Sequence, residues 1–262
     1  MTDHLLRDEA DGIVTLTLNR PASRNALTLE MYDALAATCR GISGEAGVRA
    51  LIIRGAGDRA FAAGTDMSAF RSFSTPDDAI AYEQRMEGGF RDIERCAVPT
   101  IAAITGACTG GGAAIAAACD LRLADASLKF GFPIARTLGN CLSVSNLARL
   151  SAIAGAGRVR EMIFTARLVG AEEARAAGIV SEVLPDADML HARARALAAE
   201  VGSHAPLTLR ATKEALRRLR DDGPGAEDRD LVTLCYMSED FREGLEAFLS
   251  KRAPSKPVEA TE

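Results

Sequence analysis

Apolar and polar residues in the first half of the chain follow patterns typical of strands separated by helices. Residues 13–19 alternate between apolar side chains and threonine, which predicts a strand with one buried face. Thr28 then stands where it can cap a helix over residues 29–39. Short apolar runs predict strands at residues 50–54, 99–104, 121–124 and 128–130, and helices are predicted at residues 76–95 and 111–119.

The pattern changes after Pro133, where helical periodicity predominates. Helices are predicted at residues 143–150, 158–165, 171–177, 188–201, 206–219 and 225–249. Strands that alternate with helices, followed by a helical region, indicate a mixed α/β fold. With 262 residues and 48% hydrophobic content, the chain is long enough to bury a large core.

Composition and charge argue against several function classes. The formal net charge is -5 and no long basic run occurs, so we expect no nucleic-acid partner. The longest apolar stretch, residues 113–119, is too short to span a bilayer, and the polar start does not resemble a signal peptide. We therefore expect a cytoplasmic protein without a membrane partner. One basic cluster fits either a solvated helix face or an anion site: Arg210, Lys213, Arg217, Arg218 and Arg220.

The cysteines and histidines do not form a recognisable metal or disulfide pattern. The six cysteines lack C-x-x-C spacing and are expected to behave as small hydrophobic residues in a reducing compartment. The three histidines, His4, His191 and His204, lie outside the glycine-rich segments, which argues against a histidine-based triad or a zinc site. We therefore expect no metal.

Two short segments carry the chemistry that the sequence favours. Residues 105–120 contain a glycine run that opens directly into an alanine-rich helix, leaving backbone N–H groups at the helix start uncovered. Residues 61–66 form a second tight segment at the end of a predicted strand. Two backbone donors directed at one carbonyl oxygen would form an oxyanion hole. This hypothesis requires that the two segments meet.

The order of the motifs resembles that of the enoyl-CoA hydratase/isomerase (crotonase) superfamily from Ile13 to about Arg252. The resemblance rests on residues 19–21, 25–27, 61–66, 99–106, 110–112, 119–120, 130–133, 171–174 and 177–180. It implies an α/β fold of the ClpP/crotonase type, a spiral of ββα units with a helical C-terminal region. It further implies a core over residues 1–200 with an acyl-CoA site and a trimerisation region over residues 201–262, in a homotrimer or hexamer. Coenzyme A would be part of the substrate, and no separate cofactor is implied.

The resemblance also assigns roles to individual residues. The backbone N–H groups of Thr65 and Gly111 would form the oxyanion hole. The coenzyme A thioester would contact Ala22, Arg24, Ala62, Ala63, Asp66, Met67, Gly110, Pro133 and Lys251. Two of these residues have alternative interpretations. Arg24 also fits a solvated turn, and Asp66 also fits either an acid or base or the cap of a short turn.

Two positions depart from the pattern of typical hydratases in this superfamily. Such enzymes use two glutamates to position water and move its proton. Here those positions hold Ala114 and Ile134, neither of which can carry a proton. Efficient hydration is therefore not expected, and a simple double-bond shift also lacks its usual carboxylate.

Other polar residues lie where a substitute group is expected. Asn140, Cys141 and Ser143 follow Ile134 and fit the positioning of a water or an acyl tail, although Ser143 also fits a helix cap and Cys141 an apolar contact. Arg136 fits either a substrate carboxylate or a surface acid. Glu83 and Glu87 share one face of a predicted helix and fit either a relocated base or a solvated face.

Three functional hypotheses follow from these observations. The first is an enzyme that polarises an acyl-CoA thioester without efficient water addition. The second is a non-catalytic acyl-CoA-binding or assembly subunit, which the two missing glutamates favour. The third is a hydrolase with a serine or cysteine nucleophile, which has the least support.

Overall fold

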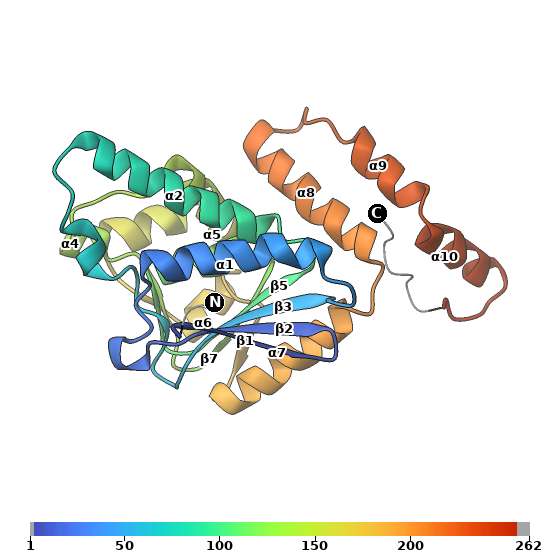
Figure 1. Cartoon of the computed structure of the whole chain (residues 1–262), viewed down its shortest axis with the longest axis horizontal. Helices are drawn as coiled ribbons and strands as arrows, with labels where there is room; N and C mark the ends of the chain where they lie inside the picture. Colours follow the sequence, from blue (N-terminus) through green and yellow to red (C-terminus); the bar gives the residue numbers. More distant parts are fainter. Residues whose placement is uncertain (1–2, 256–262) are drawn as a thin grey trace.

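The computed structural model describes residues 3–255 and contains two sheets with helices packed around them (Figure 1). The larger sheet has six strands in the order β1-β2-β3-β5-β7-β10. Its strands are β1 (Leu5–Ala10), β2 (Ile13–Leu18), β3 (Ala50–Gly55), β5 (Thr100–Ile104), β7 (Leu121–Asp125) and β10 (Glu182–Leu184). The smaller sheet consists of β4 (Ala60–Ala62), β6 (Ala107–Thr109), β8 (Lys129–Gly131) and β9 (Val169–Gly170), in that order.

The larger sheet is buried on both faces, because its central strands are parallel and helices cover both sides. Along β3, Leu51 and Ile53 join the main core, whereas Ala50 and Ile52 face the opposite side. This alternation follows the two-residue period of a strand. Helix α7 (Ala187–Val201) covers the second face (Figure 1), and its buried side chains recur every four residues at Leu190, Ala194 and Ala198.

The two sheets are connected as successive turns of a spiral. Strand β3 in the larger sheet leads to β4 in the smaller sheet and then to helix α2 (Pro76–Glu94). The next turn runs through β5 and β6 to helix α3 (Gly111–Ala118), and a third passes through β7 and β8 to α4 (Ile134–Thr137). Because β4, β6 and β8 are parallel neighbours, the loops after these strands emerge at one edge.

Helix caps agree with the sequence pattern. Thr28 caps α1 (Leu29–Gly41) by accepting a hydrogen bond from the Met31 N–H. Thr75 and Asp78 form a reciprocal capping box at the start of α2. The remaining helices are α5 (Val144–Phe164), α6 (Ala171–Ala176), α8 (Pro206–Asp222), α9 (Arg229–Tyr236) and α10 (Glu239–Leu249), and the 3-10 turns are η1 (Pro21–Ser23), η2 (Ile42–Gly44) and η3 (Met67–Phe70).

The two helices predicted between residues 143 and 165 agree with α5, which a non-helical Gly155 divides into two helical segments. Other predicted boundaries were wrong. The single helix predicted over residues 225–249 is divided into α9 and α10, because Ser238 caps a new helix start. The short strands β1, β4, β6, β9 and β10 were not predicted, since most contain two or three residues and show no period.

The helices α8, α9 and α10 lie beside the body formed by the two sheets (Figure 1). They correspond to most of the region expected to begin at residue 201, whose last residues, 256–262, lie outside the described part of the chain. Within residues 3–255, no helix combines the length and apolar character needed to cross a membrane.

Candidate active site

The two glycine-containing segments meet in the structure. A Cβ atom built on Gly110 would lie 3.5 Å from the Cα atom of Gly64, so the two loops are in van der Waals contact. A Cβ atom built on Gly111 would lie 3.1 Å from Oγ1 of Thr65. The oxyanion-hole hypothesis required that these two segments meet, and they do.

Parallel pairing brings the segments together. Ala62 at the end of β4 pairs with Cys108 in β6, so the loop after β4 lies beside the start of α3. Backbone hydrogen bonds to Leu27 hold that loop. The Leu27 N–H donates to the Gly64 carbonyl at 2.9 Å, and the Leu27 carbonyl accepts from the Asp66 N–H at 2.8 Å. The chain direction is thus fixed on both sides of Thr65.

The N–H groups of Thr65 and Gly111 have no hydrogen-bond acceptor within residues 3–255. By contrast, the Gly110 N–H donates to the Gly131 carbonyl at 3.0 Å. Gly111 is the first residue of α3, where the helix leaves N–H groups unsatisfied and the helix dipole favours negative charge. These two free N–H groups can donate hydrogen bonds to an external oxygen that carries negative charge.

A cavity of about 310 Å³ adjoins these two residues. Ala114 and Ile134, the positions at which the resemblance leads us to expect two glutamates, both line it and are 3% and 8% exposed. The side chains at these positions are apolar, so neither can hold a water by a hydrogen bond or exchange a proton. The remaining walls include Met67, Phe70, Met86, Phe90, Phe132 and Leu142.

A chain of three hydroxyl groups lies against the cavity. Oγ1 of Thr65 is 2.9 Å from the Tyr32 hydroxyl and 3.0 Å from the Tyr82 hydroxyl. Burial raises the pKa of both tyrosines, so they stay neutral at physiological pH and retain a proton to donate. Neither tyrosine was predicted as a site residue, because both lie within helices whose pattern also fits ordinary core packing.

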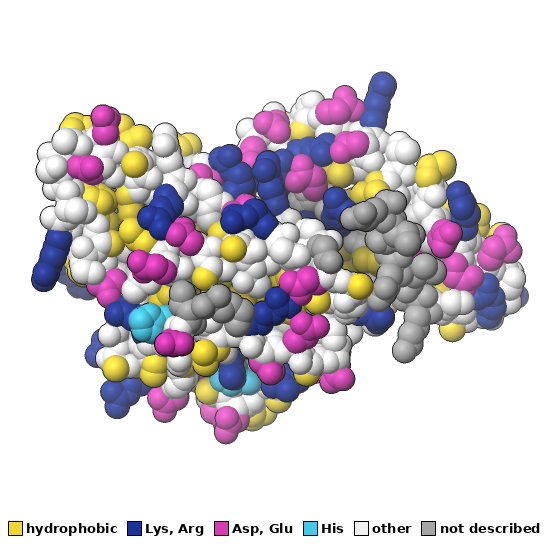
Figure 2. Space-filling model, viewed as in Figure 1, with side chains coloured by type: hydrophobic (Ala, Val, Ile, Leu, Met, Phe, Trp, Pro, Cys, Tyr) yellow, Lys and Arg dark blue, Asp and Glu magenta, His cyan; other side chains and the backbone are white. Residues whose placement is uncertain are grey.

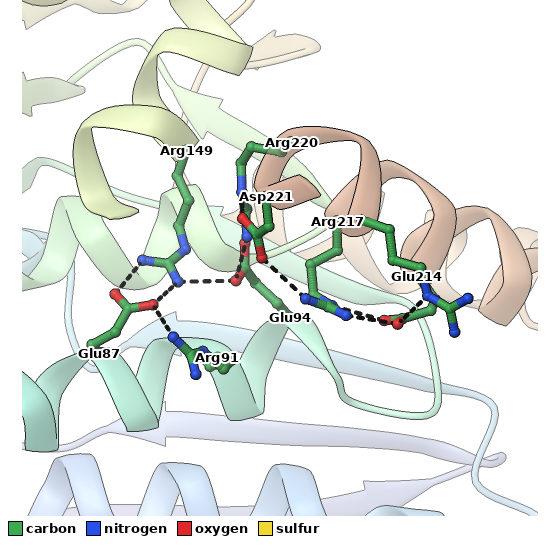
Figure 3. A network of polar contacts seen from close by, with 9 residues as sticks. Glu87, Arg91, Glu94, Arg149, Glu214, Arg217, Arg220 and Asp221 are labelled. Atoms are coloured by element: carbon green, nitrogen blue, oxygen red, sulfur yellow. Dashed lines mark hydrogen bonds and ion pairs between the residues drawn. The ribbon is translucent and has the colours of Figure 1, made fainter. Parts of the chain in front are cut away.

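The two glutamates on α2 have different surroundings. Glu83 lines the cavity and is half-buried. Glu87 instead binds Arg149 in α5 through two hydrogen bonds of 2.8 and 2.6 Å, and it lies 3.6 Å from Arg91 (Figure 3). Neither predicted alternative fits Glu87, since it is neither a free base nor part of a solvated face. Burial, and then the charge of Glu87, raises the pKa of Glu83.

Four polar residues beyond Ile134 occupy different places. Asn140 and Cys141 line the cavity. Ser143 is the N-cap of α5, accepting from the Asn146 N–H at 3.3 Å, which confirms that alternative. Arg136 is exposed, does not line the cavity and forms no ion pair within the described chain.

The residues expected to contact coenzyme A are distributed unevenly. Ala63, Met67, Gly110 and Pro133 line the cavity. Ala62 does not, because its side chain is fully buried in β4 and packs beside Gly112.

Four further residues of that predicted set lie outside the cavity. Ala22 belongs to the exposed turn η1 before Arg24, whose carbonyl accepts from the Ala63 N–H at 3.0 Å, so this turn adjoins the cavity loop. Asp66 caps η3 by accepting from the Ser68 N–H. Lys251 follows α10, and α10 lies at the end of the molecule away from α2 and α4 (Figure 1).

The environment of Asp66 favours a structural role. Hydrogen bonds from the backbone and side chain of Ser68, and then from Arg20, lower the pKa of Asp66 to about 2. A carboxyl group with so low a pKa remains ionised at neutral pH and is a poor proton donor. The prediction that Asp66 is a cap is confirmed.

The basic cluster of α8 is neither a solvated face nor an anion site. Lys213 donates to Asp120 at 2.6 Å, and Arg220 bonds to Glu94 in α2. Arg217 and Arg218 both bind Glu214 within the helix. Acidic and basic side chains are correspondingly interspersed over this part of the surface (Figure 2). Neither predicted alternative describes these four cations, because Glu214 pairs with two of them within the helix, and Asp120 and Glu94 pair with the other two from distant parts of the chain.

The cysteines partly follow the expectation of small hydrophobic residues. Four of them are buried, namely Cys39, Cys96, Cys108 and Cys119. Cys141 is exposed and lines the cavity. Over residues 3–255, no group of three or more His, Cys, Asp or Glu side chains is arranged to hold a metal ion.

Comparison with known proteins gives one consistent family. The family model described as enoyl-CoA hydratase/isomerase matches residues 8–256. The chain is 30% identical to the short-chain-enoyl-CoA hydratase of Clostridium acetobutylicum over 258 residues, which cover 95% of this chain and 96% of that protein. It is 32% identical to the 2,3-dehydroadipyl-CoA hydratase of Escherichia coli over 253 residues, which cover 95% of this chain and 97% of that protein.

Solved structures give the same result. An enoyl-CoA hydratase/carnithine racemase from Magnetospirillum magneticum superposes with a TM-score of 0.89 at 35% identity, covering 99% of this chain and 97% of that one. The predicted fold class, an α/β crotonase-type spiral with a helical C-terminal region, is confirmed. Both kinds of comparison extend over nearly the whole chain, and this chain therefore belongs to the enoyl-CoA hydratase/isomerase family.

Proposed function

We propose that this protein is an enzyme that binds acyl-CoA thioesters and stabilises negative charge on the thioester oxygen. One observation carries the proposal, namely that the unpaired N–H groups of Thr65 and Gly111 lie on two segments in contact beside one cavity. Such donors stabilise an enolate oxygen as charge develops, and loss of one typically raises the barrier by about 2.7–4 kcal/mol. Coenzyme A enters as part of the substrate.

Efficient water addition is not part of this proposal. Ala114 and Ile134 present methyl and methylene groups where a hydratase needs two carboxylates. The E. coli relative is named a hydratase, and a Dictyostelium discoideum relative at 29% identity is named a dienoyl-CoA isomerase. Reaction type therefore differs among similar chains, and the residues around the substrate carbons determine which reaction occurs.

The first test is a panel of acyl-CoA thioesters, with and without α,β-unsaturation. Binding is measured by calorimetry and conversion by mass spectrometry at high enzyme concentration. We expect binding and conversion of at least one member of the panel. Binding without conversion would support the alternative of a non-catalytic acyl-CoA-binding or assembly subunit, and covalent acylation of Cys141 would support a hydrolase.

A second test restores the missing carboxylates. The variant with both Ala114→Glu and Ile134→Glu is expected to gain hydration of 2-enoyl thioesters, because both positions line the cavity that contains the proposed donors. The Ala114→Gln and Ile134→Gln pair is the matched control, with similar volume and no ionisable group. Equal hydration by the two double variants would argue against the proposed arrangement.

We also propose that the protein assembles into a homotrimer or hexamer. The C-terminal helices expose large apolar side chains that the rest of residues 3–255 does not cover, among them Tyr236, Met237, Phe248 and Leu249. Exposed apolar surface of this kind is typical of protein–protein contacts.

A further inference from the structure

The cavity contains one carboxylate. Of the described residues that line it, Glu83 is the only acidic side chain, and no histidine, lysine or arginine lines it. The other titratable groups in the wall are Tyr32, Tyr82 and Cys141. Glu83 is therefore the side chain in this wall best suited to take up a proton at neutral pH.

Among the described residues, none pairs with the Glu83 carboxylate. Glu83 forms no hydrogen bond or ion pair with any residue in the range 3–255, whereas Glu87, one turn later, is held by Arg149. A half-buried charge without a partner is unfavourable to the fold. The Glu83 carboxylate is thus free to contact a molecule in the cavity.

Glu83 is also held at a defined place relative to the proposed oxyanion donors. The preceding residue, Tyr82, hydrogen-bonds to Oγ1 of Thr65 at 3.0 Å, which ties α2 to the loop that carries one donor. Phe70 and Phe73 pack edge-on against the Tyr82 ring, with centroids 5.1 and 5.7 Å away. These contacts restrict movement of the helix turn that contains Glu83.

A second hollow lies on the outer side of the same helix. It measures about 510 Å³ and is lined by Glu83 together with Ala79, Ile80, Gln84, Glu87, Gly88, Arg91 and Ser143. Glu83 is the one residue that the linings of the cavity and the hollow share. Glu83 therefore borders both the cavity and the hollow.

We propose that Glu83 is the catalytic base of this site and that the reaction is proton transfer at the carbons next to an acyl-CoA thioester. The inference rests on the proposed function. The carboxylate takes a proton from the α-carbon, and the C–H electron pair forms the carbon–carbon double bond of an enolate. The thioester oxygen gains the charge between the N–H groups of Thr65 and Gly111.

Return of the proton completes the reaction without a further reactant. Reprotonation at the α-carbon gives exchange with solvent. In a 3-enoyl thioester, reprotonation at the γ-carbon moves the double bond to the 2-position, and the enolate charge is lost as the thioester is restored. The same atoms are present before and after the reaction. Glu83 would thus replace the carboxylates absent at Ala114 and Ile134.

The test uses butyryl-CoA in deuterated water with the full-length protein. We expect the native protein to incorporate deuterium at the α-carbon, and Glu83→Gln to do so at least about 100-fold more slowly with unchanged affinity for butyryl-CoA. Asp77→Asn is the matched control, because it makes the same chemical change at an exposed position on the same helix. This control is expected to exchange at the native rate.

The pH dependence separates a base from a structural residue. Because the pKa of Glu83 lies above its usual value, exchange should fall as the pH is lowered through that raised pKa, and this limb should be absent in Glu83→Gln. The charged and titratable groups around Glu83 are Tyr32 on α1, Tyr82, Glu87 and Arg91 on α2, and Cys141.

Protein stability gives an independent check on the fold. A folded-state pKa raised above the unfolded value contributes stability at low pH that is lost as the pH rises. Glu83→Gln should therefore unfold at the same or a higher denaturant concentration than the native protein at pH 7. Glu83→Asp keeps the carboxylate and is expected to retain measurable exchange.

Each outcome bears on the inference. If Glu83→Gln exchanged deuterium at the native rate, at any pH, the inference would be overturned. Binding of butyryl-CoA by the native protein with no exchange would overturn it while leaving acyl-CoA binding intact. Absence of binding to every thioester would reject the proposed function and this inference together.

Discussion

At Gly111, a single hydrogen in place of a side chain determines whether the site can form. A Cβ atom there would lie 1.8 Å from the Tyr32 hydroxyl oxygen and 3.1 Å from the Cζ atom of the same ring. Tyr32 is buried, with only 4% of its surface exposed. The glycine is thus required by close packing, and the helix start would shift if it were replaced.

This packing predicts that Gly111→Ala destabilises the protein and that Tyr32→Phe reduces the loss. Gly111→Ala should lower the free energy of unfolding by about 1–3 kcal/mol, because overpacking forces side chains and backbone apart. In a Tyr32→Phe background the clashing oxygen is absent, and the loss should be smaller by at least ~1 kcal/mol. Denaturant unfolding of the four proteins in this double-mutant cycle measures the difference. Equal losses in both backgrounds would contradict the explanation.

At the scale of single elements, α5 contains two glycines with opposite roles. Gly155 has φ of 76° and ψ of 146°, a conformation that L-residues with side chains rarely adopt, and it interrupts the helix. Gly157, two residues later, is exposed, and a Cβ atom there would meet nothing within 4 Å. The same substitution should therefore act in opposite directions at the two positions.

Alanine at each position tests this contrast. Gly155→Ala should destabilise the protein by about 1–3 kcal/mol through backbone strain. Gly157→Ala should stabilise it by up to about 1 kcal/mol, because alanine has a higher helix propensity. Thermal and denaturant unfolding measure both variants. A stabilising effect of Gly155→Ala would show that the helix does not need this interruption.

Three helices are joined by a buried ion-pair network (Figure 3). Arg149 in α5 binds Glu87 and Glu94 in α2, and Glu94 also binds Arg220 in α8. The Arg149 side chain is 1% exposed, and its guanidinium lies 5.9 Å from the Phe90 ring centroid. The network fixes α2, the helix that carries Glu83, against the C-terminal helices.

Removal of Arg149, the central cation of this network, should lower the stability of the protein strongly. Arg149→Ala leaves Glu87 with only Arg91, 3.6 Å away, and Glu94 with only Arg220. Because both carboxylates then lose a buried partner, we expect a loss of about 3–5 kcal/mol in the free energy of unfolding. Arg158→Ala is the control, since Arg158 forms partly exposed pairs with Glu161 and Glu173 and should cost no more than about 1 kcal/mol. Similar losses for the two variants would mean that burial adds little to the Arg149 contacts.

At the scale of the whole molecule, the C-terminal helices present an incomplete hydrophobic surface. Phe248 and Leu249 at the end of α10 are 81% and 66% exposed. Side chains of this size are rarely left in water in a contiguous group unless another surface covers them. In the proposed trimer or hexamer, a second copy of the chain would provide that surface.

Charged side chains in place of Phe248 and Leu249 should disrupt the proposed trimer or hexamer. The double variant Phe248→Asp and Leu249→Asp is expected to show a lower mass in light scattering, approaching the 27.6 kDa of one chain. Met189→Asp is the control, because Met189 is an exposed apolar residue on α7, outside the C-terminal helices. An unchanged mass for the double variant would place the subunit contacts elsewhere.

Local features of the sequence predicted much of the fold. The Thr28 and Ser143 caps and the apolar runs of β3, β5 and β7 depend on neighbours within a few residues, and these predictions agree with the structure. The split between α9 and α10 was missed, because the helical pattern continues across Ser238 and only the backbone shows that a new helix begins there.

The candidate site was predictable in part. The glycine segments were identified from their order along the chain, whereas Tyr32 and Tyr82 were not, since their hydroxyl groups reach Thr65 across 33 and 17 positions. Glu83 and Glu87 share a helix face and are equivalent by spacing alone. Only the position of Arg149, 62 residues after Glu87, distinguishes the paired carboxylate from the free one.

The sequence by itself determined the order of most strands and helices, the glycines that allow two backbones to approach, and the apolar residues at positions 114 and 134. Tertiary structure alone decided which carboxylate faces the cavity, which acids neutralise the basic face of α8, and which hydroxyl groups surround Thr65. The reason is physical. Caps and periodicity act between near neighbours, whereas the partner of a charged or polar group is fixed by the packing of elements distant in the chain.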